Sequence, residues 1–255
     1  MMVPQALRDY FTENTRLAVA FSGGVDSSYL LYAAKACGCR VKGYYVKSAF
    51  QPQFELDDAR RLAERLDVII DILNIDILAD KRIAENPADR CYYCKRAIFE
   101  RILTAAAKDG FLSVADGTNA SDSAGDRAGM RAIAEMKIAS PLRLAGLTKA
   151  QIREYSKSAE LFTWDKPAYA CLATRIPTGR VIDCETLAKL ERSEAALSAL
   201  GFTDFRLRLC GDMVKLQLTA EQFPAAFMHK DEIYTALSEC FSEAVLDLKP
   251  RIGGK

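Results

Sequence analysis

The sequence is poor in the features that mark nucleic-acid-binding and membrane proteins. Its 35 Lys and Arg residues nearly balance its 34 Asp and Glu residues, so a formal net charge of +1 supplies no general attraction for nucleic acid. No apolar run approaches the length that spans a bilayer, and the first residues, MMVPQALRDYFTEN, lack a basic segment followed by an apolar core. We therefore expect a cytoplasmic protein that binds neither membranes nor nucleic acid.

Histidine is also scarce, which limits the metal sites that the chain can build. A zinc site commonly takes two Cys-x-x-Cys pairs or paired histidines. Here Cys91 and Cys94 form the one such pair, and the one histidine, His229, is far away in sequence. The chain nevertheless has eight cysteines. Because the cytosol keeps thiols reduced, we expect metal or sulfur chemistry from them rather than a disulfide framework.

The stretch from Leu17 to Ser28, LAVAFSGGVDSS, is the most informative part of the chain. It predicts a buried strand, a glycine turn and the start of a helix, where exposed N–H groups and the helix dipole bind anions. Asp26 would oppose an anion unless a cation lay between them, so the predicted ligand is a polyphosphate with Mg²⁺. No Lys follows the glycines, so this is not a GxxxxGK[ST] loop. The predicted ligand-binding residues are Ser22, Gly23, Gly24, Asp26, Ser27 and Ser28.

Strands and helices alternate along the first two thirds of the sequence, which predicts an α/β fold with a parallel sheet and helices on both faces. The expected strands there are Leu17 to Phe21, Val41 to Val46, Val68 to Leu73 and Ser113 to Asp116. The expected helices are Pro4 to Thr12, a helix that follows the glycine turn and runs to about Ala36, Glu55 to Leu66, Lys95 to Lys108 and Lys149 to Ser158.

A proline-bracketed loop, Trp164 to Pro177, predicts a domain boundary, which we place between residues 170 and 171. Residues 171–255 then form a smaller α+β domain after the first domain, 1–170. Its expected helices are Cys184 to Leu200, Glu221 to Phe227 and Lys230 to Phe241. Its expected strands are Phe205 to Leu209, Met213 to Leu218 and Ala244 to Leu248.

A second loop is expected beside the first, because ligands bind at the carboxyl ends of parallel strands. It follows the predicted strand Ser113 to Asp116. Gly and Asn here are also typical of a simple turn. We favour a role in completing the polyphosphate and Mg²⁺ site, through Gly117, Thr118, Asn119 and Asp122.

The pair Cys91 and Cys94, together with Cys171 in the proline-bracketed loop, leaves several interpretations open. The pair alone could be a redox dithiol, with the adjacent Arg90 and Lys95 lowering the thiol pKa values. Three thiolates could instead hold an iron–sulfur cluster with one iron left open for chemistry. Unrelated packed cysteines are the third alternative.

Arg206 and Arg208 fall two apart on a predicted strand and therefore share one face. Such a pair can be merely solvated or can bind a phosphate through charge-assisted hydrogen bonds.

Motifs that together span almost the whole chain resemble those of the LarE-type ATP-dependent sulfur transferases, members of the PP-loop ATP pyrophosphatases. They are SGGVDSS, NPADRCYYCK, DGTNASDSAGDRAG, SPLRLAGLTKAQIRE, WDKPAYACLATRIPTG and GFTDFRLR. The resemblance implies that a PP-loop domain adenylates a carboxylate of pyridinium-3,5-biscarboxylic acid mononucleotide, and that sulfur then displaces AMP. The product serves the nickel-pincer nucleotide cofactor, and a homo-oligomer, with a hexamer as the expected form, is also implied.

The resemblance further implies the source of the sulfur. One kind of family member sacrifices the sulfur of the cysteine that matches Cys171 and is left with dehydroalanine. Another kind holds a [4Fe-4S] cluster with all three cysteines, and this sequence is similar to that kind. The family pattern also assigns a group of residues to the substrate side, namely Arg175, Glu194, Arg206 and Arg208. Ala128 and Thr178 depart from the family's usual proline and tyrosine.

Two other functions remain open on the sequence alone. A tRNA-thiolating PP-loop enzyme shares the adenylation step, but it would need a basic surface or an RNA-binding module. A nucleotide-binding sensor on a similar fold would have no need of three cysteines near the ATP site.

Overall fold

The computed structural model describes residues 3–122 and 127–252, which fall into two compact units. The first unit comprises Met1–Ile77 and Asp89–Lys166, and the second comprises Leu78–Ala88 and Pro167–Lys255. The predicted division at residues 170 and 171 lies just beyond the end of the first unit. The segment Leu78–Ala88, which that division leaves in the first domain, clusters with the second unit instead.

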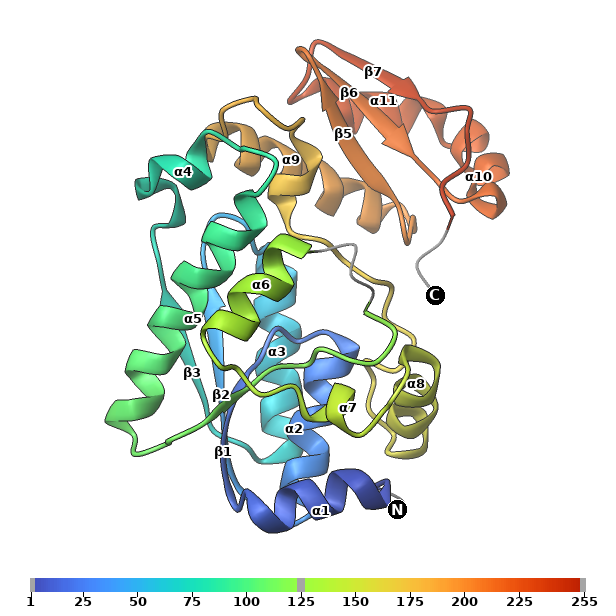
Figure 1. Ribbon diagram of the computed structural model, residues 1–255. Coiled ribbons are helices and arrows are strands. Elements are labelled where there is room, and N and C mark those ends of the chain that lie inside the picture. Colours follow the sequence, from blue (N-terminus) through green and yellow to red (C-terminus); the bar gives the residue numbers. More distant parts are fainter. Residues whose placement is uncertain (1–2, 123–126, 253–255) are drawn as a thin grey trace. The chain divides into compact units, whose positions relative to one another are not determined.

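The first unit is built on a parallel sheet of four strands in the order β3-β2-β1-β4 (Figure 1). The strands are β1 (Arg16–Ala20), β2 (Arg40–Lys47), β3 (Ile70–Asn74) and β4 (Val114–Ala115). In register, Leu17 lies opposite Val41 of β2, and Ala18 lies opposite Val114 of β4. The predicted α/β class with a parallel sheet is confirmed.

Helices pack on both faces of this sheet because side chains alternate along β1. Leu17 and Val19 join one buried cluster with residues of α2 and α3, whereas Ala18 joins a second cluster with Phe99 and Ile102 of α5. The helices of this unit are α1 (Gln5–Glu13), α2 (Val25–Ala36), α3 (Gln53–Leu66), α5 (Arg90–Lys108), α6 (Arg127–Glu135), α7 (Pro141–Leu144) and α8 (Lys149–Ser158).

The second unit holds a smaller mixed sheet in the order β5-β6-β7. Strands β5 (Arg206–Cys210) and β6 (Met213–Gln217) are antiparallel, and β7 (Glu243–Leu246) pairs parallel to β6. The longer helices are α9 (Cys184–Ala199), α10 (Phe223–Met228) and α11 (Lys230–Ser238). Short helical turns complete the description: η1 (Ile77–Ala79), α4 (Lys81–Ala84), η2 (Leu172–Arg175) and η3 (Ala220–Gln222).

Backbone hydrogen bonds tie the segment Leu78–Ala88 into the second unit. Ile182 N donates to Ala84 O at 2.7 Å, and Gly179 N donates to Asn86 O at 2.8 Å. The buried side chain of Asn86 donates from Nδ2 to Pro177 O at 2.8 Å. Residues from the middle of the chain therefore complete a unit that is otherwise C-terminal.

Several element boundaries differ from the sequence-based expectation, and at two of them the backbone hydrogen bonds give the reason. Helix α5 begins at Arg90, not Lys95, because Asp89 O already accepts Tyr92 N at 2.9 Å. Strand β3 begins at Ile70, not Val68, because Val68 N closes helix α3 by donating to Ala63 O at 2.9 Å. No helix among the described residues is both long and apolar enough to cross a membrane.

Candidate functional site

The loop between β1 and α2 has the conformation of an anion-binding turn. Gly23 adopts a φ of +73°, and Gly24 caps α2 in an extended conformation. Ser22 N donates to Ser27 Oγ at 3.2 Å, and Ser27 Oγ donates to Gly24 O at 3.3 Å. These bonds fix the loop, while the first N–H groups of α2 have no partners within the helix and are available to phosphate oxygens.

The surroundings of Gly23 disfavour any larger residue at this position of the turn. A Cβ atom there would lie 3.2 Å from Glu55 O and 3.3 Å from the Cβ of Ala59 on helix α3. The positive φ adds strain for any side chain. We call the segment Ser22–Ser28 the phosphate loop.

The loop that follows β4 lies directly against the phosphate loop. A Cβ added to Gly117 would lie 2.8 Å from Ser27 N, so only glycine allows this approach. The expected proximity of the two loops is therefore present in the first unit. Whether the second loop, Asp116–Asp122, contacts ATP stays a prediction.

Internal hydrogen bonds already engage several polar groups of this second loop. Thr118 Oγ1 donates to Asp116 Oδ2 at 2.6 Å, and Asp116 Oδ1 accepts from Ser140 Oγ at 2.7 Å. Asn119 N donates to Asp122 Oδ2 at 2.8 Å, and Asn119 Oδ1 accepts from Ser121 N at 2.8 Å. Thr118 and Asp122 therefore shape the turn.

Three buried polar atoms of the two loops have no hydrogen-bond partner among the described residues. They are Asp26 Oδ1, Ser28 Oγ and Asn119 Nδ2. Buried polar atoms without partners are costly, and three of them in two adjoining loops are consistent with a ligand site. Burial raises the pKa of Asp26 above its ordinary value, and Lys149 offsets only part of that rise. A carboxylate oxygen, a hydroxyl and an amide N–H fit a nucleotide with its Mg²⁺.

Lys149 belongs to this site, although its sequence context predicted only the start of a helix. Its Nζ donates to Asp26 Oδ2 at 2.6 Å. Thr148 and Gln151 form a capping box that starts α8, and Lys149 N donates to Ser121 Oγ at 2.9 Å. A Lys just after a helix cap is common on surfaces, so nothing in the local pattern indicates a partner 123 positions away.

Cys91 and Cys94 lie within the first two turns of α5, whereas the sequence-based helix began only at Lys95. Their spacing of three residues puts both on one side of the helix. Cys94 is buried, and Arg90 Nη1 donates to its Sγ at 3.8 Å. Two thiols of this kind fit part of an iron–sulfur ligand set.

Among the described residues, no group of three or more His, Cys, Asp or Glu side chains is placed to hold a metal ion. Cys171 belongs to the second unit. The three-cysteine cluster therefore stays a prediction.

In the second unit, Cys171 precedes the turn η2, and arginines bind the backbone of this loop. Arg175 Nη1 donates to Ala170 O at 3.1 Å, Arg206 Nη2 donates to Ala168 O, and Arg208 Nη1 donates to Thr174 O. We call residues 168–175 the cysteine loop. Both strand arginines are thus engaged by the protein itself, because main-chain carbonyls of this loop accept their hydrogen bonds.

Glu194 of helix α9 is the centre of this arrangement. It accepts hydrogen bonds from Arg175 Nε at 2.7 Å, Arg175 Nη2 at 3.1 Å, Tyr169 Oη at 2.6 Å and Leu207 N at 3.2 Å. The Arg175 side chain is completely buried. Burial alone would lower the pKa of Arg175, but Glu194 raises it above its ordinary value. Direct substrate contact by Arg175 and Glu194 stays a prediction, whereas their mutual ion pair is a feature of the structure.

The cluster carries more positive than negative charge. Burial, with the charges of Arg175 and Arg251, lowers the pKa of Arg206 to about 10, and the same causes lower that of Arg208. Arg206 therefore stays protonated at neutral pH. An excess of guanidinium groups, of which Arg175 and Arg206 are buried, favours an anionic ligand.

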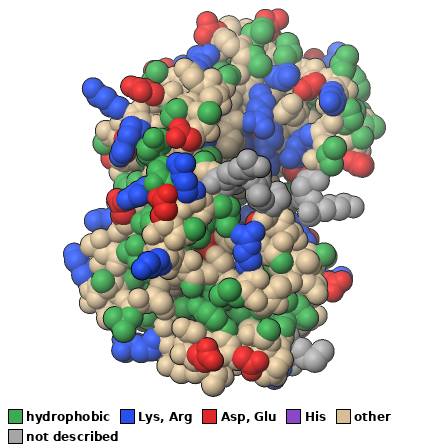
Figure 2. Space-filling view, in the orientation of Figure 1, with side chains coloured by type: hydrophobic (Ala, Val, Ile, Leu, Met, Phe, Trp, Pro, Cys, Tyr) green, Lys and Arg blue, Asp and Glu red, His purple; other side chains and the backbone are tan. Residues whose placement is uncertain are grey.

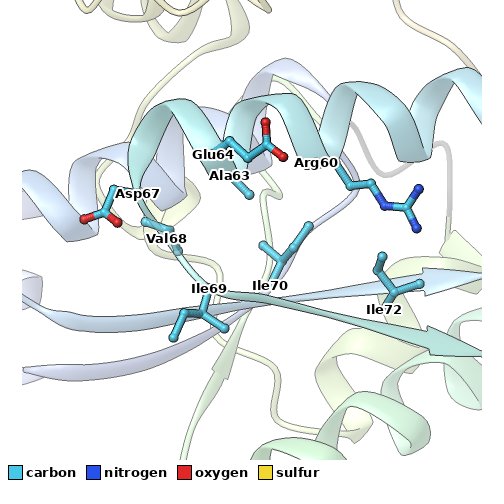
Figure 3. Close-up of a pocket in the computed structure, with 8 residues that line it drawn as sticks. All are labelled: Arg60, Ala63, Glu64, Asp67, Val68, Ile69, Ile70 and Ile72. Carbon is cyan, nitrogen blue, oxygen red and sulfur yellow. The ribbon is translucent and has the colours of Figure 1, made fainter.

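A groove of about 440 Å³ in the first unit lies away from these features (Figure 3). It is lined by the C-terminal part of α3 and by Ile69, Ile70 and Ile72 at strand β3. It includes the amino-terminal end of β3, whereas ligands of parallel sheets bind at the carboxyl ends. We assign it no part in the site.

Comparison with known proteins agrees with this geometry. A sequence profile of the tRNA methyl transferase HUP domain matches residues 15–90, which include the phosphate loop. A tRNA-specific 2-thiouridylase of Clostridium botulinum is 32% identical over 117 residues, 40% of this chain and 33% of that protein.

Two relatives match over nearly the whole chain. An uncharacterized protein of Synechocystis is 32% identical over 219 residues, 85% of this chain and 81% of that protein. The pyridinium-3,5-bisthiocarboxylic acid mononucleotide synthase of Lactiplantibacillus plantarum is 30% identical over 236 residues, 91% of this chain and 86% of the synthase. Together with the phosphate loop, this places the chain in the LarE-type family of ATP-dependent sulfur-transferring enzymes, which are built on a PP-loop ATP-binding domain.

Proposed function

We propose that this enzyme activates a carboxylate of pyridinium-3,5-biscarboxylic acid mononucleotide with ATP and replaces the resulting AMP by sulfur. The observation that carries the ATP half is the set of unpartnered buried atoms, Asp26 Oδ1, Ser28 Oγ and Asn119 Nδ2, in two loops that touch. The substrate is suggested by the name of the Lactiplantibacillus plantarum synthase, whose alignment covers 91% of this chain. A cytoplasmic location and a homo-oligomeric, hexameric state remain part of the proposal.

The chemistry follows two balanced steps. The substrate carboxylate attacks the α-phosphorus of ATP, which forms an acyl-adenylate and releases pyrophosphate. Hydrosulfide then attacks the acyl carbon, and AMP leaves as the carbon–sulfur bond forms. In this scheme the N–H groups at the start of α2 bind the departing pyrophosphate, and Asp26 holds Mg²⁺ against it.

The substrate phosphate is assigned to Arg206 and Arg208. The excess positive charge around Arg206, which is buried, and Arg208, which is half-buried, supports the assignment. Their acceptors include carbonyls of the cysteine loop and are all neutral, so an incoming phosphate would exchange a neutral acceptor for a charged one, which is the stronger partner. Glu194 and Arg175 then act by holding this region in place.

The sulfur is assigned to a [4Fe-4S] cluster held by Cys91, Cys94 and Cys171. When bound, such a cluster would present hydrosulfide on the iron that lacks a protein thiolate. The helical spacing of Cys91 and Cys94 and the guanidinium of Arg90 beside Cys94 support the pair as ligands. The alternative is that Cys171 gives up its own sulfur and becomes dehydroalanine.

Iron and sulfide analysis of anaerobically purified protein, followed by intact-mass analysis after turnover, separates these two sources. We expect iron and sulfide in the active protein, and loss of both cluster and sulfur transfer when Cys91, Cys94 or Cys171 is changed to Ala. The control variants change Cys37, Cys39, Cys184, Cys210 or Cys240 to Ala and should stay active. Dehydroalanine at position 171, or full activity without iron, would replace the cluster by the sacrificial route.

The ATP half is tested separately with Asp26→Ala. AMP and pyrophosphate formation should disappear while the fold persists, since a loop carboxylate contributes little to the core. Unchanged AMP formation would remove Asp26 from the Mg²⁺ site.

A tRNA-thiolating activity is the competing function, favoured by the partial match to a 2-thiouridylase. That match covers 40% of this chain, and Lys and Arg side chains are interspersed with Asp and Glu over the face drawn in Figure 2. Incubation with ATP, a sulfur source and unmodified tRNA should give no thiolated nucleoside. Its appearance at the rate of the small-molecule reaction would favour the competing function.

A further inference from the structure

In the first unit, an ion pair between Lys149 and Asp26 joins the start of helix α8 to the start of helix α2. Lys149 Nζ lies 2.6 Å from Asp26 Oδ2, and both side chains are largely buried, with 25% and 21% of their surface exposed. Asp26 is the second residue of α2. The pair therefore lies at the helix end that is expected to receive a polyphosphate.

The backbone of Lys149 is held firmly beside that helix end. Its N–H donates to Ser121 Oγ, and Ala120 N donates to Leu147 O at 2.8 Å, so both sides of the α8 start are bonded to the second loop. The capping box of Thr148 and Gln151 fixes the first turn of α8. Movement of the ammonium group therefore requires rotation of the Lys149 side chain only.

Two other charged groups, Arg153 and Asp122, act on Asp26 through their charge, and neither is hydrogen-bonded to it in the part of the chain that the structure describes. Arg153 lowers the pKa of Asp26 through its charge, but its guanidinium donates to Trp164 O at 2.6 Å and Lys166 O at 2.8 Å. Asp122 has the same sign as Asp26 and raises its pKa. Lys149 is thus the cation that bonds Asp26 in this structure.

The carboxylate of Asp26 is only half used by this pair. Oδ2 accepts from Lys149, whereas Oδ1 is buried without a hydrogen-bond partner among the described residues. Mg²⁺ binds carboxylate oxygens at about 2.0–2.1 Å and keeps a near-octahedral shell. A divalent ion at this carboxylate would repel the adjacent ammonium, because two cations cannot share a mostly buried anion without a large repulsive energy.

We propose that Lys149 is the placeholder cation of the ATP site: it neutralises Asp26 until Mg²⁺ binds, and it then transfers to the phosphate chain of ATP. A flexible ammonium with three donors suits such an exchange, because it can bind a carboxylate and a phosphate oxygen equally well. The transfer would add a positive charge to the departing pyrophosphate. The proposal rests on the ATP half of the proposed function and needs neither the pyridinium substrate nor the iron–sulfur cluster.

The test compares Lys149→Met, Lys149→Arg and Asp26→Asn with wild type, in the full chain. Lys157→Met is the matched control, since Lys157 is an exposed lysine on the same helix. Thermal unfolding and calorimetric titration are followed with MgCl₂ alone, with ATP in EDTA, and with ATP plus MgCl₂. These readouts report binding and stability without any sulfur transfer.

We expect Lys149→Met to lower the Tm of the nucleotide-free protein by a few degrees, because Asp26 loses its counterion. MgCl₂ alone should bind this variant about five-fold more tightly than wild type, the factor for a weak competing ion pair. ATP plus MgCl₂ should bind on the order of ten- to a hundred-fold more weakly, the loss typical of one hydrogen bond to a charged group. Lys157→Met should match wild type in each titration.

Unchanged Mg²⁺ affinity and unchanged ATP affinity in Lys149→Met would overturn the proposal. If that variant does not fold, Lys149→Arg decides: the proposal requires a planar guanidinium to release Asp26 less readily and so to weaken Mg²⁺ binding. Wild-type Mg²⁺ affinity there would overturn it. A third outcome is that the binding changes occur as expected but the enzyme transfers no sulfur to the pyridinium compound. That result would contradict the proposed substrate and leave the role of Lys149 in place.

Discussion

The phosphate loop and the cysteine loop satisfy their polar groups in opposite ways. In the phosphate loop region of the first unit, Asp26 Oδ1, Ser28 Oγ and Asn119 Nδ2 are buried without partners. In the second unit, Arg175, Arg206 and Arg208 all donate to carbonyls of the cysteine loop. The phosphate loop region can accept a ligand without breaking existing hydrogen bonds of these three atoms, because none of them has a partner among the described residues. The second is closed on itself, so a ligand there has to displace hydrogen bonds that already exist.

The largest effect is expected at the ion pair that closes the second region. Glu194→Ala leaves the completely buried Arg175 without its carboxylate, and removing one partner of a buried pair costs about 3–5 kcal/mol. Urea unfolding of the full chain measures the loss. Glu185→Ala on the same helix is the control, because Glu185 is 79% exposed in its pair with Lys189 and should cost less than about 0.5 kcal/mol. Equal losses would mean that Glu194 does not hold this region.

The next effect tests whether the first region is as rigid as its contacts indicate. Gly117→Ala places a Cβ 2.8 Å from Ser27 N, so the two loops have to separate. A misplacement of about 1 Å can cost about 100-fold in rate, which we expect for AMP formation. Gly43→Ala is the matched control, because its added Cβ makes an equally close contact of 2.8 Å. That contact is with a side-chain atom of Ile70, whereas the contact at Gly117 is with the backbone of the phosphate loop. AMP formation that survives equally in both variants would show that the loops adapt to their ligand.

A smaller effect tests the displacement of the arginines. Arg206→Met or Arg208→Met should weaken substrate binding by about 1.5–3 kcal/mol, the worth of a hydrogen bond to a charged group, and leave ATP affinity nearly unchanged. Alkylation of Cys171 should also become faster, since the cysteine loop loses a tether. Arg180→Met, at a side chain that is 40% exposed, is the control. If ATP binding and substrate binding weaken equally, the assignment of the two arginines to the substrate phosphate is wrong.

The smallest effect concerns the start of helix α9, which carries Glu194. Asp183 caps this helix by accepting from Thr186 N at 2.7 Å, and Asp183→Ala should cost about 1 kcal/mol, whereas Asp183→Asn should cost little. Burial would raise the pKa of Asp183, but hydrogen bonds from Thr186 hold it below its ordinary value. The stabilisation is therefore present at neutral pH and is lost as pH falls through the folded-state pKa. Urea unfolding of wild type and Asp183→Ala at several pH values should show the difference shrinking in acid.

The same contrast explains what the sequence could predict. The phosphate loop is one continuous string, so glycine, serine and helix-start preferences act within a few residues and identify it directly. The parallel sheet follows from alternating strand and helix patterns, and the proximity of Gly117 to Ser27 follows from the rule for strand ends.

The remaining features depend on contacts between distant residues. Lys149 and Asp26 are 123 positions apart, and Arg208 reaches Thr174 across 34 positions. Two arginines on one strand face are compatible with solvent or with a ligand, and only the folded chain reveals that main-chain carbonyls receive them. The early start of α5 also escaped the pattern, because Asp89 and Arg90 precede the apolar periodicity of that helix.

The insertion of Leu78–Ala88 into the second unit has a consequence for folding. The Asn86 side chain donates a hydrogen bond to Ile176 O, 90 positions further along the chain. Closing a loop of this length is slow, because the chain loses conformational entropy before the contact forms. During synthesis this segment emerges long before its partners, so the second unit cannot be completed until residues near Ile182 leave the ribosome. A fragment that starts at Pro167 would lack the acceptors of Gly179 N and Ile182 N and should not fold to the native state by itself.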